Sequence, residues 1–487
     1  MSEASTTAKA PSRAARIGLW LGPAWLLMTL LVPAPAGMPP AAWACAGMTL
    51  FMATWWATEA IPIPVTALLP LVLVPALGIG SMGSASAEYG NPVIFLFLGG
   101  FLLAIALQRW NLHRRIALRV LLVVGQEPTY QVAGFMLATG FVSMWVSNTA
   151  TAIMMLPIAI SVIERLAAAR DSNDEGEVSR YATALLLAVA YAASIGGIAT
   201  LIGTPPNALL AGYLAKHHGM HIGFAQWMLI GLPVSAVMML LAWWWLTRSG
   251  FRIDTTNCCE QVLCVELERL GPLTTAERRI GGVFVLTAAA WIARPVLNDV
   301  GLPWLSDNLI SLLAGISLFL LPSGQARGVR LLDWDHAKTL PWDILLLFGG
   351  GLAMAGAIEQ AGLAGWIAAQ LGEFGWLPST LLIGALVLMV TLLTEFTSNT
   401  TTAATFLPLL GALAVSTGID PLLLAVPATI AASCAFMMPI STPPNAVVFG
   451  SGRLTVGAMM RAGLFLNVAG SVAITLLVTA LLRLFWL

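Results

Sequence analysis

Two polar, uncharged blocks occur twice in this chain, in the same order, inside strongly apolar sequence. The first copies are Ser147-Asn148-Thr149 and Thr204-Pro205-Pro206-Asn207, and the second copies are Ser398-Asn399-Thr400 and Thr442-Pro443-Pro444-Asn445. Two consecutive prolines break a helix, and polar backbone at membrane depth is costly unless it lines a site. The doubled pair of blocks therefore predicts two broken helices and marks where the protein does its work.

The sequence around these blocks is typical of a membrane protein. Of the 487 residues, 58% are hydrophobic and 9% are charged, and the net charge is zero. A soluble domain carries about 25% charged residues, whereas several runs here approach the roughly 20 apolar residues that cross a bilayer. The zero net charge argues against binding to nucleic acid. The apolar run from Ile17 lacks a clean small-residue cleavage site after it, so we interpret it as a retained first transmembrane helix.

Hydropathy predicts an all-α polytopic membrane protein with about 11 transmembrane helices and two re-entrant hairpins. The hairpins, at residues 131–164 and 378–416, contain the two Ser-Asn-Thr blocks at their middle. One straight span would place that polarity in lipid, so a hairpin that enters and leaves on one side is less costly. The spans are expected near residues 17–36, 42–60, 63–81, 91–109, 181–213, 225–247, 279–298, 305–322, 343–361, 421–450 and 457–486.

The distribution of Lys and Arg predicts the orientation in the membrane. With the N-terminus in the cytoplasm and neither hairpin crossing, 20 of the 23 basic residues lie on the cytoplasmic side. Residues 1–16 then form a cytoplasmic N-terminal tail and residues 248–278 a cytoplasmic linker. The linker separates a first repeat at residues 17–247 from a second at 279–487, and the two repeats have opposite orientation. We expect a multi-pass protein of a bacterial-type inner (plasma) membrane.

The chemistry of the blocks favours a joint site for an anion and cations. A broken helix offers carbonyls to a cation at one end and N–H groups to an anion at the other. Neither pair of blocks contains Lys or Arg. Because a helix N-terminus provides only about half a charge, a doubly negative substrate needs bound cations nearby. The alternative interpretation of a Thr-Pro-Pro-Asn block is a proline kink with a local cap, and that of a Ser-Asn-Thr block is a capped half-helix.

Glu395 lies three residues before Ser398, inside the second predicted hairpin. Intramembrane carboxylates are functional candidates by default. The sequence leaves three roles open for Glu395: it tunes the second cation site, it carries a proton, or it is structural.

These residues resemble the divalent-anion/sodium symporter family, which includes the INDY-type di- and tricarboxylate transporters. The resemblance rests on the doubled blocks, on the stretch from Trp55 to Pro64, and on Gly271-Pro272-Leu273-Thr274. It covers the chain from about residue 17 to the end. The resemblance implies two inverted repeats, each with a hairpin and an unwound helix, in a homodimer whose transport domain moves like an elevator against a fixed scaffold.

The resemblance also implies residue roles, with Na⁺ as the coupling ion and no organic cofactor. The first sodium site would use Ser143, Ser147, Asn148 and the Gly203 backbone, and the second Thr394, Thr397, Asn399 and Ser441. Substrate carboxylates would meet Asn148, Thr149, Asn399 and Thr400, with Thr204, Pro205, Thr442 and Pro443 close by. Thr397 and Ser441 stand where the family typically has a small apolar residue.

Our hypothesis is a secondary active transporter that couples sodium to the uptake of C4-dicarboxylates such as succinate, malate or fumarate. The nearest alternatives are transport of sulfate or a tricarboxylate such as citrate, and dicarboxylate exchange without sodium. A membrane-embedded enzyme is disfavoured because the five His are scattered and no Ser-His or paired-Asp arrangement lies within the spans. A channel fits poorly with two opposed hairpins that close on one site.

Overall fold

The computed structural model describes residues 13–125, 127–168, 175–251, 258–371 and 378–487. Within these ranges all regular structure is helical apart from an isolated bridge between Pro322 and Arg330, which confirms the all-α prediction. In the same ranges nine helices are long and apolar enough to cross a membrane. Four shorter apolar helices accompany them.

The first third of the chain builds an antiparallel pair and a chain of shorter helices. The predicted span at 63–81 is interrupted near Ala67, because Pro62, Pro64 and Pro70 start separate short helices there. The elements are α1 (Arg13–Leu31), α2 (Pro40–Thr58), α3 (Ile63–Thr66), α4 (Leu69–Ala76), α5 (Met82–Ala87), η1 (Glu88–Gly90), α6 (Pro92–Arg109) and α7 (Leu112–Val123).

The first hairpin and the first broken helix follow. Two helices meet at the first Ser-Asn-Thr block, and a later helix stops before Pro205 and restarts there. The elements are α8 (Pro128–Ser143), α9 (Asn148–Ala168), α10 (Glu175–Ile198), α11 (Pro205–His217) and α12 (Phe224–Thr247).

The linker region and the start of the second half are helical as well. The predicted linker at 248–278 contains a helix of its own, and it is fastened to α7 by a buried ion pair between Arg115 and Glu277 at 2.6 Å. The elements are α13 (Cys258–Arg269), α14 (Thr275–Asp299), α15 (Asp307–Leu320), α16 (Trp334–Ala337), α17 (Trp342–Gln360) and α18 (Leu363–Leu371).

The last part of the chain repeats the order of hairpin, broken helix and long helix. The second Ser-Asn-Thr block again lies between two helices, and the second Thr-Pro-Pro-Asn block again restarts a helix. The elements are α19 (Ser379–Thr394), α20 (Asn399–Thr417), α21 (Pro421–Ala432), α22 (Pro443–Phe449) and α23 (Val456–Phe485).

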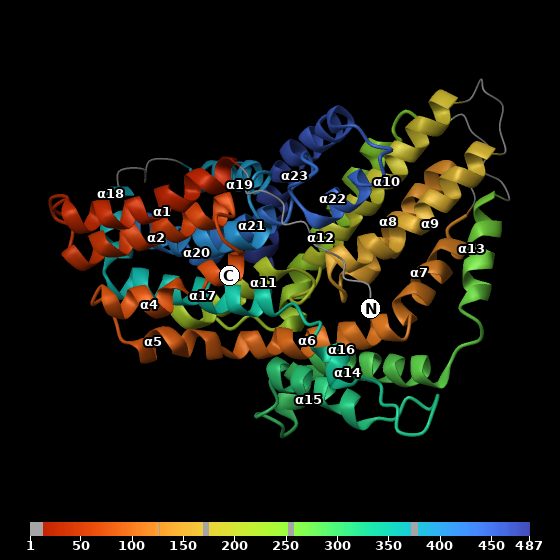
Figure 1. Cartoon of the computed structure of the whole chain (residues 1–487), viewed down its shortest axis with the longest axis horizontal. Helices are drawn as coiled ribbons and strands as arrows, with labels where there is room; N and C mark the ends of the chain where they lie inside the picture. The colour runs from red at the N-terminus through yellow and green to blue at the C-terminus, as the bar shows by residue number, and fades with distance from the viewer. Residues whose placement is uncertain (1–12, 126, 169–174, 252–257, 372–377) are drawn as a thin grey trace.

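The packing of the two halves is reciprocal. In the first half α8 and α9 pack on α10, and in the second half α19 and α20 pack on α21. The restarted helices cross over: α11 packs on α20, and α22 packs on α9. In Figure 1 the α8–α9 pair and α20 lie toward opposite ends of the molecule, with α11, α12 and α22 between them. This exchange is what a two-fold relation between the predicted repeats would produce; that relation and the opposite orientation of the repeats in the membrane stay predictions.

The broken helices form the centre of the fold. In an apolar stretch of 18 residues within α10, 94% of the residues are buried inside the protein, whereas 17% are buried in the corresponding stretch of α14. A helix that is apolar all round and buried all round belongs to a core, whereas one that exposes apolar residues needs lipid or another chain against it. The helix α10, which carries the first break, is therefore enclosed by the rest of the molecule.

Candidate functional site

The first broken helix is unwound over residues 199–204. The α10 helix ends at Ile198, and Thr204 has an extended backbone with φ −141° and ψ 141°. Pro205 and Pro206 occupy the first positions of α11, where a missing N–H leaves no hydrogen bond unmade. The break therefore lies where the two prolines predict it.

Asn207 holds this unwound segment in place. Its side chain is fully buried, and Nδ2 lies 2.8 Å from the Thr200 carbonyl oxygen, 3.3 Å from that of Ile198 and 3.4 Å from that of Gly197. An amide nitrogen has two protons, so these carbonyls share them. The last residue of the Thr-Pro-Pro-Asn block is thus a donor to backbone freed by the break.

Four oxygen-bearing groups converge beside the first hairpin turn and form what we call the first oxygen cluster: the Ser143 hydroxyl, the Asn148 amide, and the carbonyls of Ala193 and Gly203. The Ser143 hydroxyl oxygen lies 2.6 Å from the Ala193 carbonyl oxygen and 2.6 Å from Asn148 Oδ1. The same terminal atom of the Asn148 amide lies 3.0 Å from the Ala193 oxygen and 3.3 Å from the Gly203 oxygen. One hydroxyl proton cannot satisfy all of these acceptors. Either the Asn148 amide nitrogen turns toward them, or a hard cation takes them as its oxygen ligands.

Two glycines make this convergence possible. A Cβ on Gly197 would lie 2.7 Å from Asn148 Oδ1 and 2.9 Å from the Gly203 carbonyl oxygen. A Cβ on Gly203 would lie 2.5 Å from the Gly197 carbonyl oxygen. These approaches are closer than real side chains allow, so the first oxygen cluster requires glycine at both positions.

The second repeat has an equivalent oxygen cluster. The Thr394 hydroxyl lies 2.9 Å from Asn399 Oδ1 and 2.8 Å from the Ala432 carbonyl oxygen. The hydroxyl and the amide are five residues apart, as Ser143 and Asn148 are in the first repeat. The first carbonyl comes from α10, five residues before that helix ends, and the second comes from the last residue of α21. The two clusters thus share a hydroxyl, an amide and a helix carbonyl, and the first adds the Gly203 carbonyl.

The second unwound segment, residues 433–442 between α21 and α22, is tied in the same manner as the first. Asn445 is fully buried, and its Nδ2 lies 3.0 Å from Ser441 Oγ, 3.1 Å from the Met438 carbonyl oxygen and 3.3 Å from that of Ala435. The Thr442 hydroxyl accepts the Asn445 N–H at 3.3 Å and caps α22. The two Thr-Pro-Pro-Asn blocks therefore restart a helix and fasten the segment before it.

Glu395 binds the second unwound segment from its other side. Its side chain is 1% exposed. Its two oxygens accept the N–H groups of Phe436 at 2.7 Å, Met437 at 2.9 Å and Met438 at 2.9 Å. Oε1 also accepts from Asn467 Nδ2 at 2.6 Å. All four contacts are with donors, which favours an anchoring role over proton transfer.

Three predicted sodium ligands have hydroxyls that bond outside these clusters. The exposed Ser147 hydroxyl accepts from the Ala150 N–H at 3.3 Å and caps α9. The Thr397 hydroxyl lies 2.6 Å from that of Thr402. The Ser441 hydroxyl donates to a carbonyl within the unwound segment at 2.7 Å. Their roles as sodium ligands stay predictions.

The predicted substrate residues lie at the starts of four helices. Asn148 and Asn399 begin α9 and α20, while Thr204 and Thr442 are the buried residues before α11 and α22. Helix N-termini carry unpaired N–H groups and a partial positive charge, which suits carboxylate oxygens. The full predicted set is Asn148, Thr149, Thr204, Pro205, Asn399, Thr400, Thr442 and Pro443, and its contact with substrate stays a prediction.

Sequence reasoning missed several groups. The carbonyl groups of Ala193 and Ala432 carry no sequence signal, because every residue has one. Asn467 offered a signal, since it is a buried amide in the long apolar helix α23. A polar side chain at such a place needs a partner, and the partner here is Glu395.

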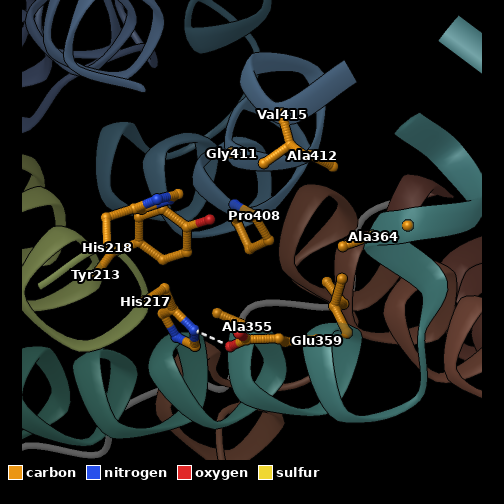
Figure 2. Close-up of a pocket in the computed structure, with 12 residues that line it drawn as sticks. Tyr213, His217, His218, Ala355, Glu359, Ala364, Pro408, Gly411, Ala412 and Val415 are labelled. Carbon is orange, nitrogen blue, oxygen red and sulfur yellow. Dashed lines mark hydrogen bonds and ion pairs between the residues drawn. The ribbon is translucent and has the colours of Figure 1, made fainter. Parts of the chain in front are cut away.

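A separate cavity of about 190 Å³ lies at the end of α11, between α17, α18 and α20. Figure 2 shows His217 pointing toward Glu359 there, with Tyr213 and His218 beside it. His217 Nδ1 lies 2.5 Å from a Glu359 oxygen, and the neighbouring Lys216 pairs with Glu88 at 2.8 Å. No motif residue lines this cavity, so it is distinct from the two oxygen clusters.

Comparison with known proteins places this arrangement in one family. The family model described as "Sodium:sulfate symporter transmembrane region" matches residues 15–487. The sodium-dependent dicarboxylate transporter SdcS of Staphylococcus aureus strain USA300 is 41% identical over 471 residues, which is 95% of this chain and 90% of the relative. The protein of the same name from strain NCTC 8325 has the same identity and coverage.

A solved structure has a related fold. The crystal structure of the Alcanivorax borkumensis YdaH transporter, whose title reports an unusual topology, aligns with a TM-score of 0.58 over 98% of this chain and 99% of that one. The sequences are 14% identical, so this likeness shows the fold alone. The family model, the close relatives and the doubled motifs agree: the chain belongs to the sodium:sulfate symporter family, the divalent-anion/sodium symporters, of multi-pass membrane transporters.

Proposed function

We propose that this protein is a sodium-coupled importer of C4-dicarboxylates such as succinate, malate and fumarate, and a transporter rather than an enzyme. The observation that carries the proposal is the pair of matched oxygen clusters, each built at a hairpin turn beside an unwound helix. Hydroxyl, amide and carbonyl oxygens are the ligands that a hard cation prefers. Two clusters of similar construction suit two sodium ions.

The substrate class follows from charge. The Ser-Asn-Thr and Thr-Pro-Pro-Asn blocks contain no Lys or Arg, so a dianion between them is neutralised by bound sodium and by helix N-termini. Sodium and substrate then bind together, because each reduces the cost of the other's charge. Relatives named as sodium-dependent dicarboxylate transporters support a dicarboxylate.

Sulfate is the second candidate substrate. The description of the matched family names sodium and sulfate. Sulfate is also a dianion, but it is compact and places both charges on one centre. A dicarboxylate instead spans two carboxylates, which suits one Ser-Asn-Thr block from each repeat, Asn148 and Thr149 facing Asn399 and Thr400.

The transport cycle we propose is an elevator. The hairpins and broken helices, α8–α11 and α19–α22, move as one body against α1–α7, α14, α15 and α17, with the N-terminus in the cytoplasm and the protein as a homodimer. The ion pair of Lys216 with Glu88 and the hydrogen bond between His217 and Glu359 join the two bodies at the end of α11. They would have to break during each cycle.

Uptake of labelled succinate into proteoliposomes tests the proposal. We expect accumulation with an inward sodium gradient, no accumulation with potassium in its place, and competition by malate and fumarate stronger than by sulfate. Uptake that is independent of sodium but requires dicarboxylate inside the vesicles would mean that the protein is an exchanger and not a sodium symporter. Uptake of labelled sulfate that succinate does not inhibit would mean that the substrate is sulfate and not a dicarboxylate.

A further inference from the structure

The turn of the first hairpin carries one large aromatic side chain, Trp145. The turn is short, since it joins Ser143, the last residue of α8, to Asn148, the first residue of α9. The first oxygen cluster closes it, because Ser143 Oγ lies 2.6 Å from Asn148 Oδ1. The Trp145 N–H donates to the Val142 carbonyl oxygen at 3.1 Å, so its backbone continues directly from α8. The contacts of the Trp145 ring therefore bear on where the two cluster residues lie.

The Trp145 ring packs against aromatic rings from outside the hairpin. It stacks on Phe224 with ring centres 5.9 Å apart and planes at 24°, and it meets Phe284 edge to face at 4.8 Å. Phe224 in turn stacks on Trp291 at 4.3 Å and 16°. Phe224 begins α12, whereas Phe284 and Trp291 lie on α14. We call these four residues the aromatic stack.

Polar contacts fix the part of the aromatic stack that receives Trp145. Asp307, at the start of α15, is 6% exposed, and its Oδ2 accepts the Phe224 N–H at 2.8 Å. Trp291 Nε1 donates to the Asp307 carbonyl oxygen at 3.1 Å. Arg294 forms an ion pair with the Asp307 carboxylate at 3.2 Å. The surface on which Trp145 docks is thus held by three helices, α12, α14 and α15.

The hairpin turn is also bound to the first broken helix. The Thr200 hydroxyl, in the unwound segment, donates to the Met144 carbonyl oxygen at 2.6 Å. Trp227, three residues after Phe224 in α12, donates from Nε1 to the Ile198 carbonyl oxygen at 2.9 Å. The first turn of α12 therefore contacts the hairpin turn through one ring and the end of α10 through another.

The second hairpin turn is held differently. Phe396 stands at the position that matches Trp145, two residues after the hydroxyl residue of its cluster and three before Asn399. Phe396 is 69% exposed. Among the residues that the structure describes, no aromatic ring packs on it. The two clusters thus share a hydroxyl and an amide, whereas the docking of the turn belongs to the first alone.

We infer that Trp145 is a positioning residue for the first sodium site. Its ring, docked on Phe224 and Phe284, holds the hairpin turn in the shape that closes the first oxygen cluster. The inference rests on the proposed sodium coupling and deepens it. A turn that is free to take other shapes is competent for only part of the time, and the apparent sodium affinity falls by that fraction. One aromatic pair shifts an equilibrium constant by about two- to twelvefold, and Trp145 makes two such pairs.

The test is the sodium dependence of succinate uptake and of thermal unfolding without substrate, with potassium chloride keeping the ionic strength constant. In Trp145→Ala we expect half-saturating sodium to rise by about tenfold, while the uptake rate at saturating sodium changes by less than that factor. Trp145→Phe keeps a ring against Phe224 and should stay within about threefold of wild type. A merely structural role would lower the unfolding temperature equally at every sodium concentration and leave half-saturating sodium unchanged, which would overturn the inference.

Two further variants complete the experiment. Phe284→Ala removes one ring contact from the far side, on α14, so half-saturating sodium should rise by about fivefold. Phe396→Ala, the matched position of the second hairpin, should leave it within about twofold of wild type.

The inference is overturned if half-saturating sodium stays within about twofold of wild type in whichever of Trp145→Ala and Phe284→Ala folds. An equal rise in Phe396→Ala and Trp145→Ala would also overturn it, because the docked ring and the exposed ring would then matter alike. A wild-type protein whose uptake and stability do not respond to sodium would overturn the proposed coupling, and the inference with it.

Discussion

The Tyr191 hydroxyl donates to the Phe436 carbonyl oxygen at 3.0 Å, and the two rings meet edge to face. Tyr191 lies on α10 of the first repeat, and Phe436 lies in the unwound segment of the second. The Phe436 N–H is bound by Glu395, so both backbone polar groups of Phe436 are held. A side chain of one repeat thus helps to set the backbone of the other repeat's site.

Tyr191→Phe tests this link. It keeps the ring contact and removes the hydroxyl, so the buried Phe436 carbonyl loses its donor. We expect a loss of about 1 kcal/mol in the free energy of unfolding, together with weaker sodium-dependent stabilisation. Denaturant unfolding of purified protein measures the first quantity. Tyr130→Phe is the control, because Tyr130 is half exposed; equal losses in both variants would contradict the link.

Gly197→Ala tests the first oxygen cluster. The new Cβ would lie 2.7 Å from Asn148 Oδ1, so the hairpin turn or the unwound segment must move. We expect initial uptake rates to fall by about tenfold or more, since misplacement by an ångström has effects of that order. Gly282→Ala is the matched control, since nothing lies within 4 Å of its added Cβ. Normal uptake by Gly197→Ala would mean that transport does not depend on the geometry of this cluster.

Asn207→Asp and Asn445→Asp test the fastening of the two unwound segments. Asp has nearly the shape of Asn but replaces the donor with an oxygen, which would face the carbonyls of Thr200 and Met438. We expect each change to be as damaging to uptake as the corresponding change to Ala. Full activity of the Asp variants would mean that the amide donors do not hold these segments.

Arg115→Ala tests how the linker is fastened. Arg115 and Glu277 are 5% and 3% exposed, and Arg115 also donates to the Gly271 carbonyl at 3.0 Å. Removing one partner of a buried ion pair leaves an uncompensated charge, and such changes typically destabilise by about 3–5 kcal/mol. Arg119→Ala, at an exposed position of the same helix, should change stability by less than about 0.5 kcal/mol. Equal stability of the two variants would rule out a structural role for the pair.

The sequence predicted the breaks of this fold better than the ligands of its site. Pro205 and Pro443 each begin a pair of consecutive prolines that places a helix restart, because prolines suit the first turn of a helix and two in succession remove two N–H donors from a helix interior. The hydroxyls of Ser143 and Thr394 were predicted from the resemblance to the family. The carbonyls of Ala193 and Ala432 were not, since the residue type at a carbonyl ligand is nearly free.

The sequence also did not predict the direction in which some polar side chains point. Ser147 and Thr397 are as polar as the residues that converge, yet their hydroxyls bond within their own hairpins. Packing chooses between such rotamers, and the sequence does not encode that choice locally. Glu395 is the opposite case: the sequence singled it out, and only the structure showed three N–H groups of a distant segment around it.

We propose that the two Ser-Asn-Thr blocks form one joint site for a dianion and its sodium ions. Calorimetric titration of purified protein with succinate, at several sodium concentrations, measures whether the two ligands bind together. We predict binding that tightens as sodium rises, is absent when potassium replaces sodium, and is lost in both Asn148→Ala and Asn399→Ala while each variant stays folded. Succinate binding of equal affinity without sodium, or unchanged binding in either variant, would contradict the claim.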